Sequence, residues 1–401
     1  MSKKNRKWLV FTIMCLAYMP GSYAQYQLSV YAPELIQSFG LTTSQFSSLF
    51  TAPMIVAIFL SFVGGMISDK VGSKKVINIS FVIAGIGMIG RVFANSYMPF
   101  FLCMALTGFS NMFVNINASK ITASWFEQEK LGILMGIFAF CGQLPGAFAT
   151  ATTAVLFDSR TSAFIVSAIF CISVFVLWLL FVKDKPEDTM EEREKIDQEN
   201  QPSIGDSLKV VLSNKGIWLV SICIMMVLGS TVTLSTFMPM ALQTMYGIDL
   251  KVCGTIASML TLGNCIGSIT GPIVFSKIKN VKVFVSGAAV LSFAGIIMCW
   301  RFPSIFVLHI LVLYTGIMLG ASMPIFLSAP VLLEGLGTKY AGSAAGVIST
   351  LQLLGAVLIP TYILTPIAGD NYSLLFMLAS ICMVIMFLCG LLLPQFGNNQ
   401  K

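Results

Sequence analysis

The chain has 401 residues, of which 56% are hydrophobic and only 10% are charged, and its mean hydropathy is +0.87. A soluble globular protein has about 25% charged residues, so this composition excludes that class and predicts an integral membrane protein. The formal net charge of +7 does not indicate a nucleic-acid partner, because the basic residues lie in separate loops between apolar segments.

Twelve apolar segments are each long enough to cross a bilayer, which needs about 20 helical residues. They cover residues 8–30, 44–66, 75–96, 98–121, 131–157, 162–182, 217–242, 252–275, 281–300, 304–328, 341–366 and 372–394. These runs lack strand-like alternation, which excludes an outer-membrane barrel. The sequence therefore predicts an all-α integral membrane fold of twelve transmembrane helices.

Basic residues favour one side of the predicted membrane protein. They gather at the amino terminus, after the second segment, in the middle of the chain and after the eighth segment. With twelve segments, those loops all lie on the same side. The positive-inside rule therefore places both termini in the cytoplasm of a multi-pass cell-membrane protein.

One long polar stretch divides the chain into two halves of six segments each. It predicts an N-terminal six-helix bundle over residues 1–182, a cytoplasmic linker over 183–216 and a C-terminal six-helix bundle over 217–401. The linker is strongly acidic between residues 187 and 199. An amphipathic helix on the membrane surface and an acidic interaction segment are alternatives for its role.

The two halves echo each other in sequence. The fifth segment opens with "KLGILMG" and the eleventh with "KYAGSAAG", and a glutamine follows about two turns later in each, Gln143 and Gln352. Repeated halves in transporters place the binding site near the bilayer midplane between them. The pair predicts a two-sided site, with chance similarity between apolar segments as the alternative.

Ionisable residues are almost absent from the segments. No Asp or Glu lies near the middle of any of them. Lys120 and Arg91 lie near segment ends, where long cations can snorkel to the interface. His309 has no carboxylate nearby in sequence, which favours packing over a proton relay. This pattern disfavours proton coupling through a buried acid and a strong mid-membrane anion site.

Neutral polar side chains remain as candidates for substrate recognition. They lie in the first, fourth, seventh and eighth segments: Tyr23, Gln25, Tyr26, Asn111, Asn115, Thr233 and Asn264. Amides in hydrocarbon also bond neighbouring helices to one another, and that structural role is the alternative for each.

The stretch "GGMISDKVGSKK" resembles the loop signature of the major facilitator superfamily. The matching positions are Gly65, Asp69, Lys70, Gly72, Lys74 and Lys75. The resemblance implies two pseudo-symmetric six-helix bundles and a conformational switch in which Asp69 latches the halves in the outward-facing state. Glycines permit the tight turn that such a loop requires.

The first half is also similar to the feline leukaemia virus subgroup C receptor-related transporters, the haem and choline branch. The similarity runs from "SYAQYQ" through "ASKITASWFEQEK" to "GQLPG". It implies that Gln143, Gln352 and Tyr23 surround a quaternary ammonium, which an aromatic wall attracts by cation–π interaction. Tyr23 stands where the branch has Trp, and Val232 stands where it has an aromatic residue.

These features predict a secondary transporter that moves a small neutral, zwitterionic or monocationic organic solute by alternating access. The alternatives are a small organic anion permease of the cyanate or carboxylate type, using Lys120 or Arg91, and a non-transporting receptor or sensor. No catalytic constellation, metal cluster or nucleotide motif occurs, so we expect no enzyme activity and no cofactor. The expected partners are a small-molecule substrate and the lipid bilayer. We expect the protein to be a monomer.

Overall fold

The structure is a computed structural model that describes residues 3–182, 204–302, 304–333 and 336–395. Most of the predicted linker, residues 183–203, lies outside the described residues. Within the described ranges the regular structure is entirely helical. Among the described residues, eleven helices are long and apolar enough to cross a membrane. The predicted all-α membrane fold is therefore confirmed.

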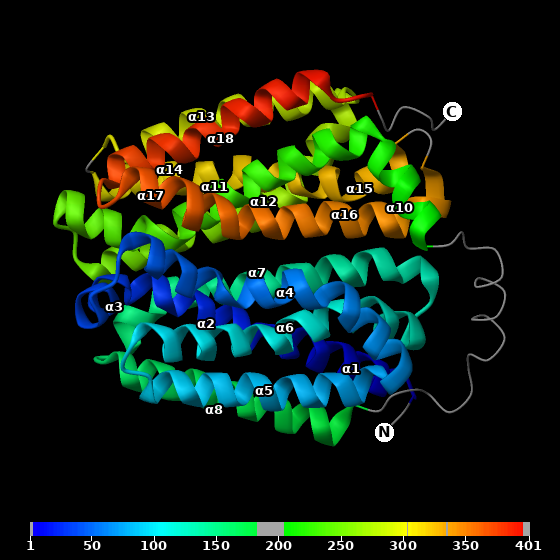
Figure 1. The fold of residues 1–401 in the computed structure, drawn as a ribbon, viewed down its shortest axis with the longest axis horizontal. Helices are drawn as coiled ribbons and strands as arrows, with labels where there is room; N and C mark the ends of the chain where they lie inside the picture. The colour runs from blue at the N-terminus through cyan, green and yellow to red at the C-terminus, as the bar shows by residue number, and fades with distance from the viewer. Residues whose placement is uncertain (1–2, 183–203, 303, 334–335, 396–401) are drawn as a thin grey trace. The chain divides into compact units, whose positions relative to one another are not determined.

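The chain folds into two compact units (Figure 1). Unit 1 comprises Met1–Leu41 and Ser48–Lys195, and unit 2 comprises Thr42–Ser47 and Ile196–Lys401. The domain limits expected from the sequence, 1–182 and 217–401, stay a prediction. The helices with most of their length in unit 1 are α1 (Lys3–Ala17), α2 (Met19–Val30), α3 (Ala32–Phe39), α4 (Thr43–Val71), α5 (Ser73–Phe93), α6 (Tyr97–Trp125), α7 (Gln128–Leu156) and α8 (Arg160–Phe181).

Unit 2 contains the helices of the second half. They are α10 (Ile204–Ser213), α11 (Lys215–Tyr246), α12 (Leu250–Ile278), α13 (Val281–Met298), α14 (Ile305–Ala321), α15 (Met323–Leu332), α16 (Gly337–Leu358), the π-helix η1 (Ile359–Leu364), α17 (Thr365–Ala368) and α18 (Tyr372–Leu392). The part of the predicted linker that the structure describes thus contains one short helix, α10.

Proline explains why three predicted segments are not single α-helices. Proline has no N–H and its ring clashes with the carbonyl four residues earlier, so it interrupts the helical ladder. Pro20 follows the break at Tyr18 between α1 and α2, Pro324 follows the break between α14 and α15, and Pro360 lies in η1. The first segment therefore crosses as two short helices and is not among the eleven long ones.

In unit 1, α5 packs against α6 and α8, and α2 packs against α6, α7 and α8 (Figure 1). The buried core between these helices is apolar and includes Trp178, Phe81, Phe138 and Met14. In lipid, such packing depends on close shape matching because the surrounding acyl chains are equally apolar. The broken first span is thus enclosed on three sides by helices of its own unit.

In unit 2, α12 and α14 approach each other through glycines. A Cβ added at Gly263, Gly267 or Gly271 of α12 would overlap the backbone of α14, and one added at Gly316 would overlap α12. Small residues spaced by four let two membrane helices approach backbone to backbone. These glycines are therefore close-packing residues of unit 2.

Candidate functional site

The break in the first span is bridged by an amide of α6. In the orientation that satisfies both of its polar atoms, Asn111 donates to the Tyr18 carbonyl at 3.2 Å and accepts from the Ser22 backbone N–H and hydroxyl, each at 3.1 Å. A helix break leaves backbone groups without partners, and these are costly in a membrane. Asn111 therefore acts as a cap for α2. This is the structural role, bonding between neighbouring helices, that the sequence analysis gave as the alternative to solute binding.

Two tyrosine rings of the first span pack against Gly142 and Gly146, the two glycines of "GQLPG" in α7. A Cβ at Gly142 would overlap the Tyr18 ring, and one at Gly146 would lie 2.9 Å from Cδ2 of Tyr26. The Tyr18 ring also stacks on Phe138 of α7, with centroids 4.7 Å apart. The absent side chains let α2 and α7 pack closely, which explains the two glycines in a helix that they would otherwise weaken.

Gln143 lies next to Gly142 and its side chain is exposed on α7. On α6, Asn115, Ser119 and Lys120 are also exposed, about one to two and a half turns after the capping Asn111. Polar and charged groups inside spans face a bundle interior or a water-filled cavity rather than lipid. The exposed polar groups of α6 and α7 are therefore candidates for the transport pathway.

The other predicted residues of the first span contact neighbouring helices of unit 1. Gln25 is buried and its amide donates to the Phe50 carbonyl of α4 at 2.9 Å. Tyr26 packs edge-to-face on Phe50, with centroids 5.5 Å apart, and Tyr23 packs in the same manner on Phe170 of α8, at 6.2 Å. Tyr23 thus lies against α8, whereas Tyr18 and Tyr26 lie against α7, the helix of Gln143.

Arg91 does not snorkel, and that expectation is wrong. Its side chain is only 1% exposed at the end of α5. Its Nη1 donates to the Ala24 carbonyl at 2.9 Å, and its Nη2 donates to Gln27 Oε1 at 2.9 Å and to the Ser167 hydroxyl. The guanidinium also lies 4.4 Å from the Phe164 ring centroid. A buried cation needs such compensation because its desolvation is costly.

This network joins α2, α5 and α8 through residues that sequence reasoning did not single out. Gln27 accepts from Arg91 and donates through Nε2 to the Ala163 carbonyl at 3.2 Å. Helical periodicity along the first segment could have placed Gln27 on the buried face of that span. Nothing in the sequence shows, however, that α5 packs against this face. Arg91 is therefore a structural cation in unit 1.

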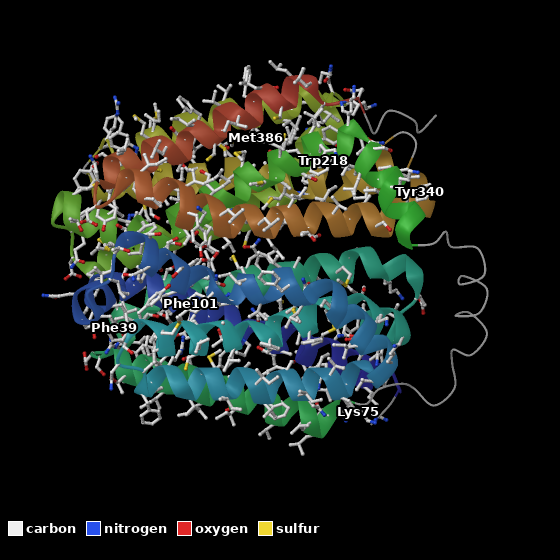
Figure 2. All side chains as sticks on the ribbon, in the orientation of Figure 1. Phe39, Lys75, Phe101, Trp218, Tyr340 and Met386 are labelled. Atoms are coloured by element: carbon white, nitrogen blue, oxygen red, sulfur yellow. The ribbon has the colours of Figure 1, made fainter. Side chains whose placement is uncertain are left out.

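The signature loop between α4 and α5 is a tight turn centred on Gly72. Gly72 has φ +95°, a conformation that only glycine adopts without strain. Ser68 is buried and accepts a hydrogen bond from Asn117 Nδ2 of α6 at 3.0 Å. Lys75 is exposed at the end of unit 1 opposite Phe39 (Figure 2). The Asp69 side chain lies outside the described side chains, so its switch role stays a prediction.

At the same end of unit 1, an exposed ion pair lies at the start of α7, between its N-cap Glu127 and Lys130. Lys130 Nζ lies 2.8 Å from Glu127 Oε2. This hydrogen bond and the lysine charge hold the pKa of the Glu127 carboxyl below its usual value. Because both side chains are exposed, solvent screens the pair, and we assign it no role in binding.

In unit 2 the predicted polar residues have different environments. Thr233 is buried and donates to the Gly229 carbonyl at 2.8 Å, and Asn264 is buried against Gly320. Gln352 of α16 is half-buried. His309 Nε2 lies 3.2 Å from the Thr255 hydroxyl, and its Nδ1 lies 2.8 Å from the Ile305 carbonyl. These contacts support the packing role expected for His309.

The described residues form helices, eleven of them long and apolar enough to cross a membrane, and this architecture defines a polytopic membrane protein. The chain matches the Major Facilitator Superfamily over residues 10–360, and it belongs to this superfamily. It is thus a multi-pass membrane transporter, as the signature loop implied. The narrower similarity to the haem and choline branch stays a prediction.

Curated relatives cover most of the chain at low identity. A probable sulfoacetate transporter of Cupriavidus necator is 24% identical over 85% of this chain and 83% of its own length. A galacturonate transporter of Dickeya chrysanthemi is 22% identical over 74% and 90%. A membrane sensor protein of Salmonella typhimurium is 24% identical over 88% and 83%.

Solved structures show the same fold. A bacterial homologue of the human lysosomal transporter Spinster, in an inward-facing and unoccupied conformation, superposes with a TM-score of 0.78 at 13% identity. The superposition covers 98% of this chain and 95% of the other. At this identity the likeness supports the fold alone.

Proposed function

We propose that this transporter moves a small organic anion with a carboxylate or sulfonate group across the cell membrane by alternating access. The observation that carries the proposal is the exposed Lys120 on α6. It lies five residues before the end of the helix, or about 7.5 Å along its axis at about 1.5 Å per residue. A cation at that depth is favourable where it meets water and an anionic solute.

Other exposed polar side chains of α6 and α7 suit the rest of a small polar solute along the pathway. Asn115 and Ser119 are exposed on the same helix, and Gln143 is exposed on α7, which contacts α6. An ammonium attracts a carboxylate or sulfonate, while neutral amides and hydroxyls bond the remaining polar groups. The expectation that Gln352, Thr233 and Asn264 of unit 2 also bind the solute stays a prediction.

The named substrates of the relatives support the anion class. Sulfoacetate and galacturonate are both organic anions, and they name relatives that cover most of this chain. This support reverses the order expected from the sequence, in which a neutral or cationic solute came first. That order rested on the lack of a cation in the middle of a span, whereas Lys120 lies near a span end and is exposed.

A quaternary ammonium solute is the second candidate. It is favoured by the half-buried Tyr23 and its edge-to-face partner Phe170, an aromatic pair of the kind that attracts cations. Tyr23 packs on α8, however, and Gln143 belongs to α7. The exposed cation Lys120 would also repel such a solute, which places this candidate second.

Counterflow in proteoliposomes tests the proposal. Vesicles loaded with sulfoacetate, galacturonate, glucuronate, choline or betaine are diluted into trace labelled solute, with protein-free vesicles as the control. We expect exchange of at least one anion and none of choline. Exchange of choline without any anion would contradict the proposal. Exchange of neither class by correctly folded protein would also contradict it and would favour a sensor.

A further inference from the structure

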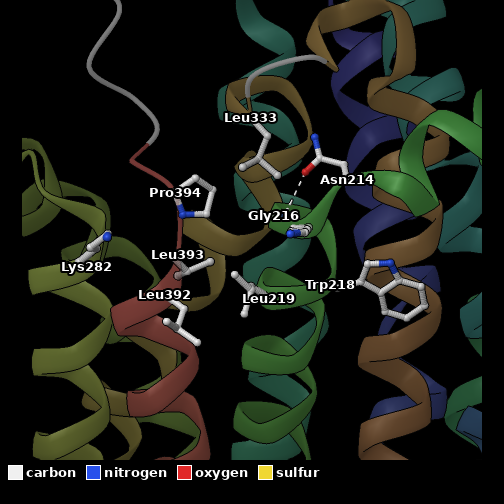
Figure 3. A pocket seen from close by; sticks show the side chains of 10 residues that line it. Asn214, Gly216, Trp218, Leu219, Lys282, Leu333, Leu392, Leu393 and Pro394 are labelled. Carbon is white, nitrogen blue, oxygen red and sulfur yellow. Dashed lines mark hydrogen bonds between the residues drawn. The ribbon is translucent and has the colours of Figure 1, made fainter.

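A pocket of about 810 Å³ opens at one end of unit 2, and none of the residues expected to bind solute lines it (Figure 3). Helices α11, α13, α15 and α18 bring its walls together. The lining residues are Asn214, Lys215, Gly216, Trp218, Leu219, Lys282, Leu333, Leu392, Leu393 and Pro394. The transport function proposed above uses none of them.

The pocket lies at the level where membrane spans begin and end. The span of α11 begins at Lys215, that of α13 begins at Val281, and that of α18 ends at Leu392. Trp218 is 43% exposed and its indole N–H donates to the Leu212 carbonyl at 2.8 Å. Tryptophan is enriched where the headgroups of a bilayer meet its hydrocarbon. The pocket therefore lies at the membrane–water interface.

The charged residues of the pocket are all positive. Lys215 and Lys282 are exposed, and no acidic residue is among the ten described residues that line it. Asn214 caps the start of α11 by accepting from the Gly216 N–H at 2.9 Å, so Lys215 stands at the positive end of a long helix. This arrangement attracts an anion.

Most of the remaining lining residues are apolar, and two of them, Leu219 and Leu392, lie within the membrane spans. Leu219 is more than one turn closer to the span interior than the α11 cap, and Leu392 lies on the last turn of α18. Figure 3 shows Leu219, Leu392 and Leu393 between Lys282 and Trp218. A free phosphate or a soluble anion would leave these leucines exposed to water, whereas an acyl chain would bury their apolar surface.

We propose that this pocket binds an anionic phospholipid. The phosphodiester and the anionic headgroup contact Lys215 and Lys282, and the first part of an acyl chain packs on the leucines beneath them. Basic pockets between membrane helices attract anionic headgroups by this combination of charge and apolar surface. A bound lipid would join the ends of α11, α13 and α18, and would stabilise unit 2 by an amount that grows with the logarithm of the lipid concentration above its Kd.

Native mass spectrometry of the purified full chain tests this proposal with two lipids of identical acyl chains, phosphatidylglycerol and phosphatidylcholine. We expect at least about tenfold tighter binding of phosphatidylglycerol to the wild-type protein. The double variant Lys215→Gln/Lys282→Gln removes this preference. The matched control Lys209→Gln/Lys277→Gln removes two exposed lysines of unit 2 outside the pocket and keeps the preference.

A second variant tests the apolar wall without changing the charge. Leu219→Trp fills part of the pocket and should weaken phosphatidylglycerol binding several-fold while both lysines remain. Glycerol phosphate, the headgroup without chains, should not displace the lipid. Equal binding of both lipids, an unaffected Lys215→Gln/Lys282→Gln variant, an equal loss in the control, or displacement by glycerol phosphate would each overturn the proposal.

Discussion

Lys120 and Arg91 are two cations near span ends of unit 1, and their environments are opposite. Arg91 is buried. It donates to the Ala24 carbonyl and the Gln27 side chain of α2 and to the Ser167 hydroxyl of α8. Lys120 is exposed on α6. A buried, compensated cation stabilises a fold, whereas an exposed one can meet a solute, so substitutions at the two positions should have different effects.

At Lys120 we expect substitution to affect transport more than stability. Lys120→Gln should lower kcat/KM for the transported anion by at least about tenfold, since a charge-assisted hydrogen bond contributes about 1.5–3 kcal/mol. Lys120→Arg should retain most of the activity. The measurement is initial counterflow rate against solute concentration, with Lys251→Gln, an exposed lysine of unit 2, as the control. A Lys120→Gln protein that transports like the wild type would refute the site.

At Arg91 we expect the reverse. Arg91→Lys should lower the free energy of unfolding by about 1.5–3 kcal/mol, because a single ammonium cannot replace the fork that reaches Ala24, Gln27 and Ser167 together. Thermal unfolding of the purified protein measures this. Arg160→Lys, at a partly exposed arginine 3.5 Å from Glu34, is the control and should change stability by less than about 1 kcal/mol. An unchanged melting temperature for Arg91→Lys would show that the network is dispensable.

At the scale of elements, unit 1 depends on how the broken first span fits between its neighbours. Asn111 of α6 caps the start of α2, and Gly142 and Gly146 of α7 make room for two rings of the first span. Gln143 lies within this contact, on the exposed side of α7. The packing of α2 on α7 therefore positions a residue proposed to bind the solute.

This packing is tested by a single methyl group. Gly142→Ala places a Cβ against the Tyr18 ring and should force α2 away from α7, at a cost of about 1–3 kcal/mol. Gly136→Ala on the same helix is the control, because a Cβ there meets no atom within 4 Å. Melting temperature and counterflow should both fall in the first variant only. Equal behaviour of the two variants would mean that α2 and α7 can separate without loss.

At the scale of the whole molecule, the proposed mechanism requires a protein that changes between two access states. The signature loop is the candidate switch, and its tight turn at Gly72 is present. Ser68, in the last turn of α4 before this loop, accepts a hydrogen bond from Asn117 of α6, the helix that also contains Lys120. A change in the loop therefore has a direct physical connection to a helix of the proposed pathway.

Asp69→Asn separates switching from binding. Neutralising this carboxylate should reduce counterflow at least about tenfold while the affinity for the anion, measured by calorimetry, changes less than about threefold, because the latch acts on the exchange of states. Asp158→Asn, an exposed acid between α7 and α8, is the control. Normal counterflow by Asp69→Asn would refute the switch.

Much of the architecture follows from the sequence because the bilayer imposes it. Spans must be helical and about 20 residues long to satisfy their backbone groups in hydrocarbon, so apolar runs predict the helices and prolines predict some of the breaks. The signature loop pointed to the superfamily through its residue pattern, and its Gly72 has a positive φ that favours glycine.

Neighbours across helices were decided only by the tertiary structure. The sequence shows how deep a residue lies in a span but not which helix it faces. Asn111 and Asn115 are one turn apart, yet the first caps α2 and the second is exposed. Arg91 and Lys120 both lie near span ends, yet only Arg91 is buried in a network that joins three helices. Hydropathy along one helix does not report these contacts, because they depend on the packing of helices that are distant in the chain.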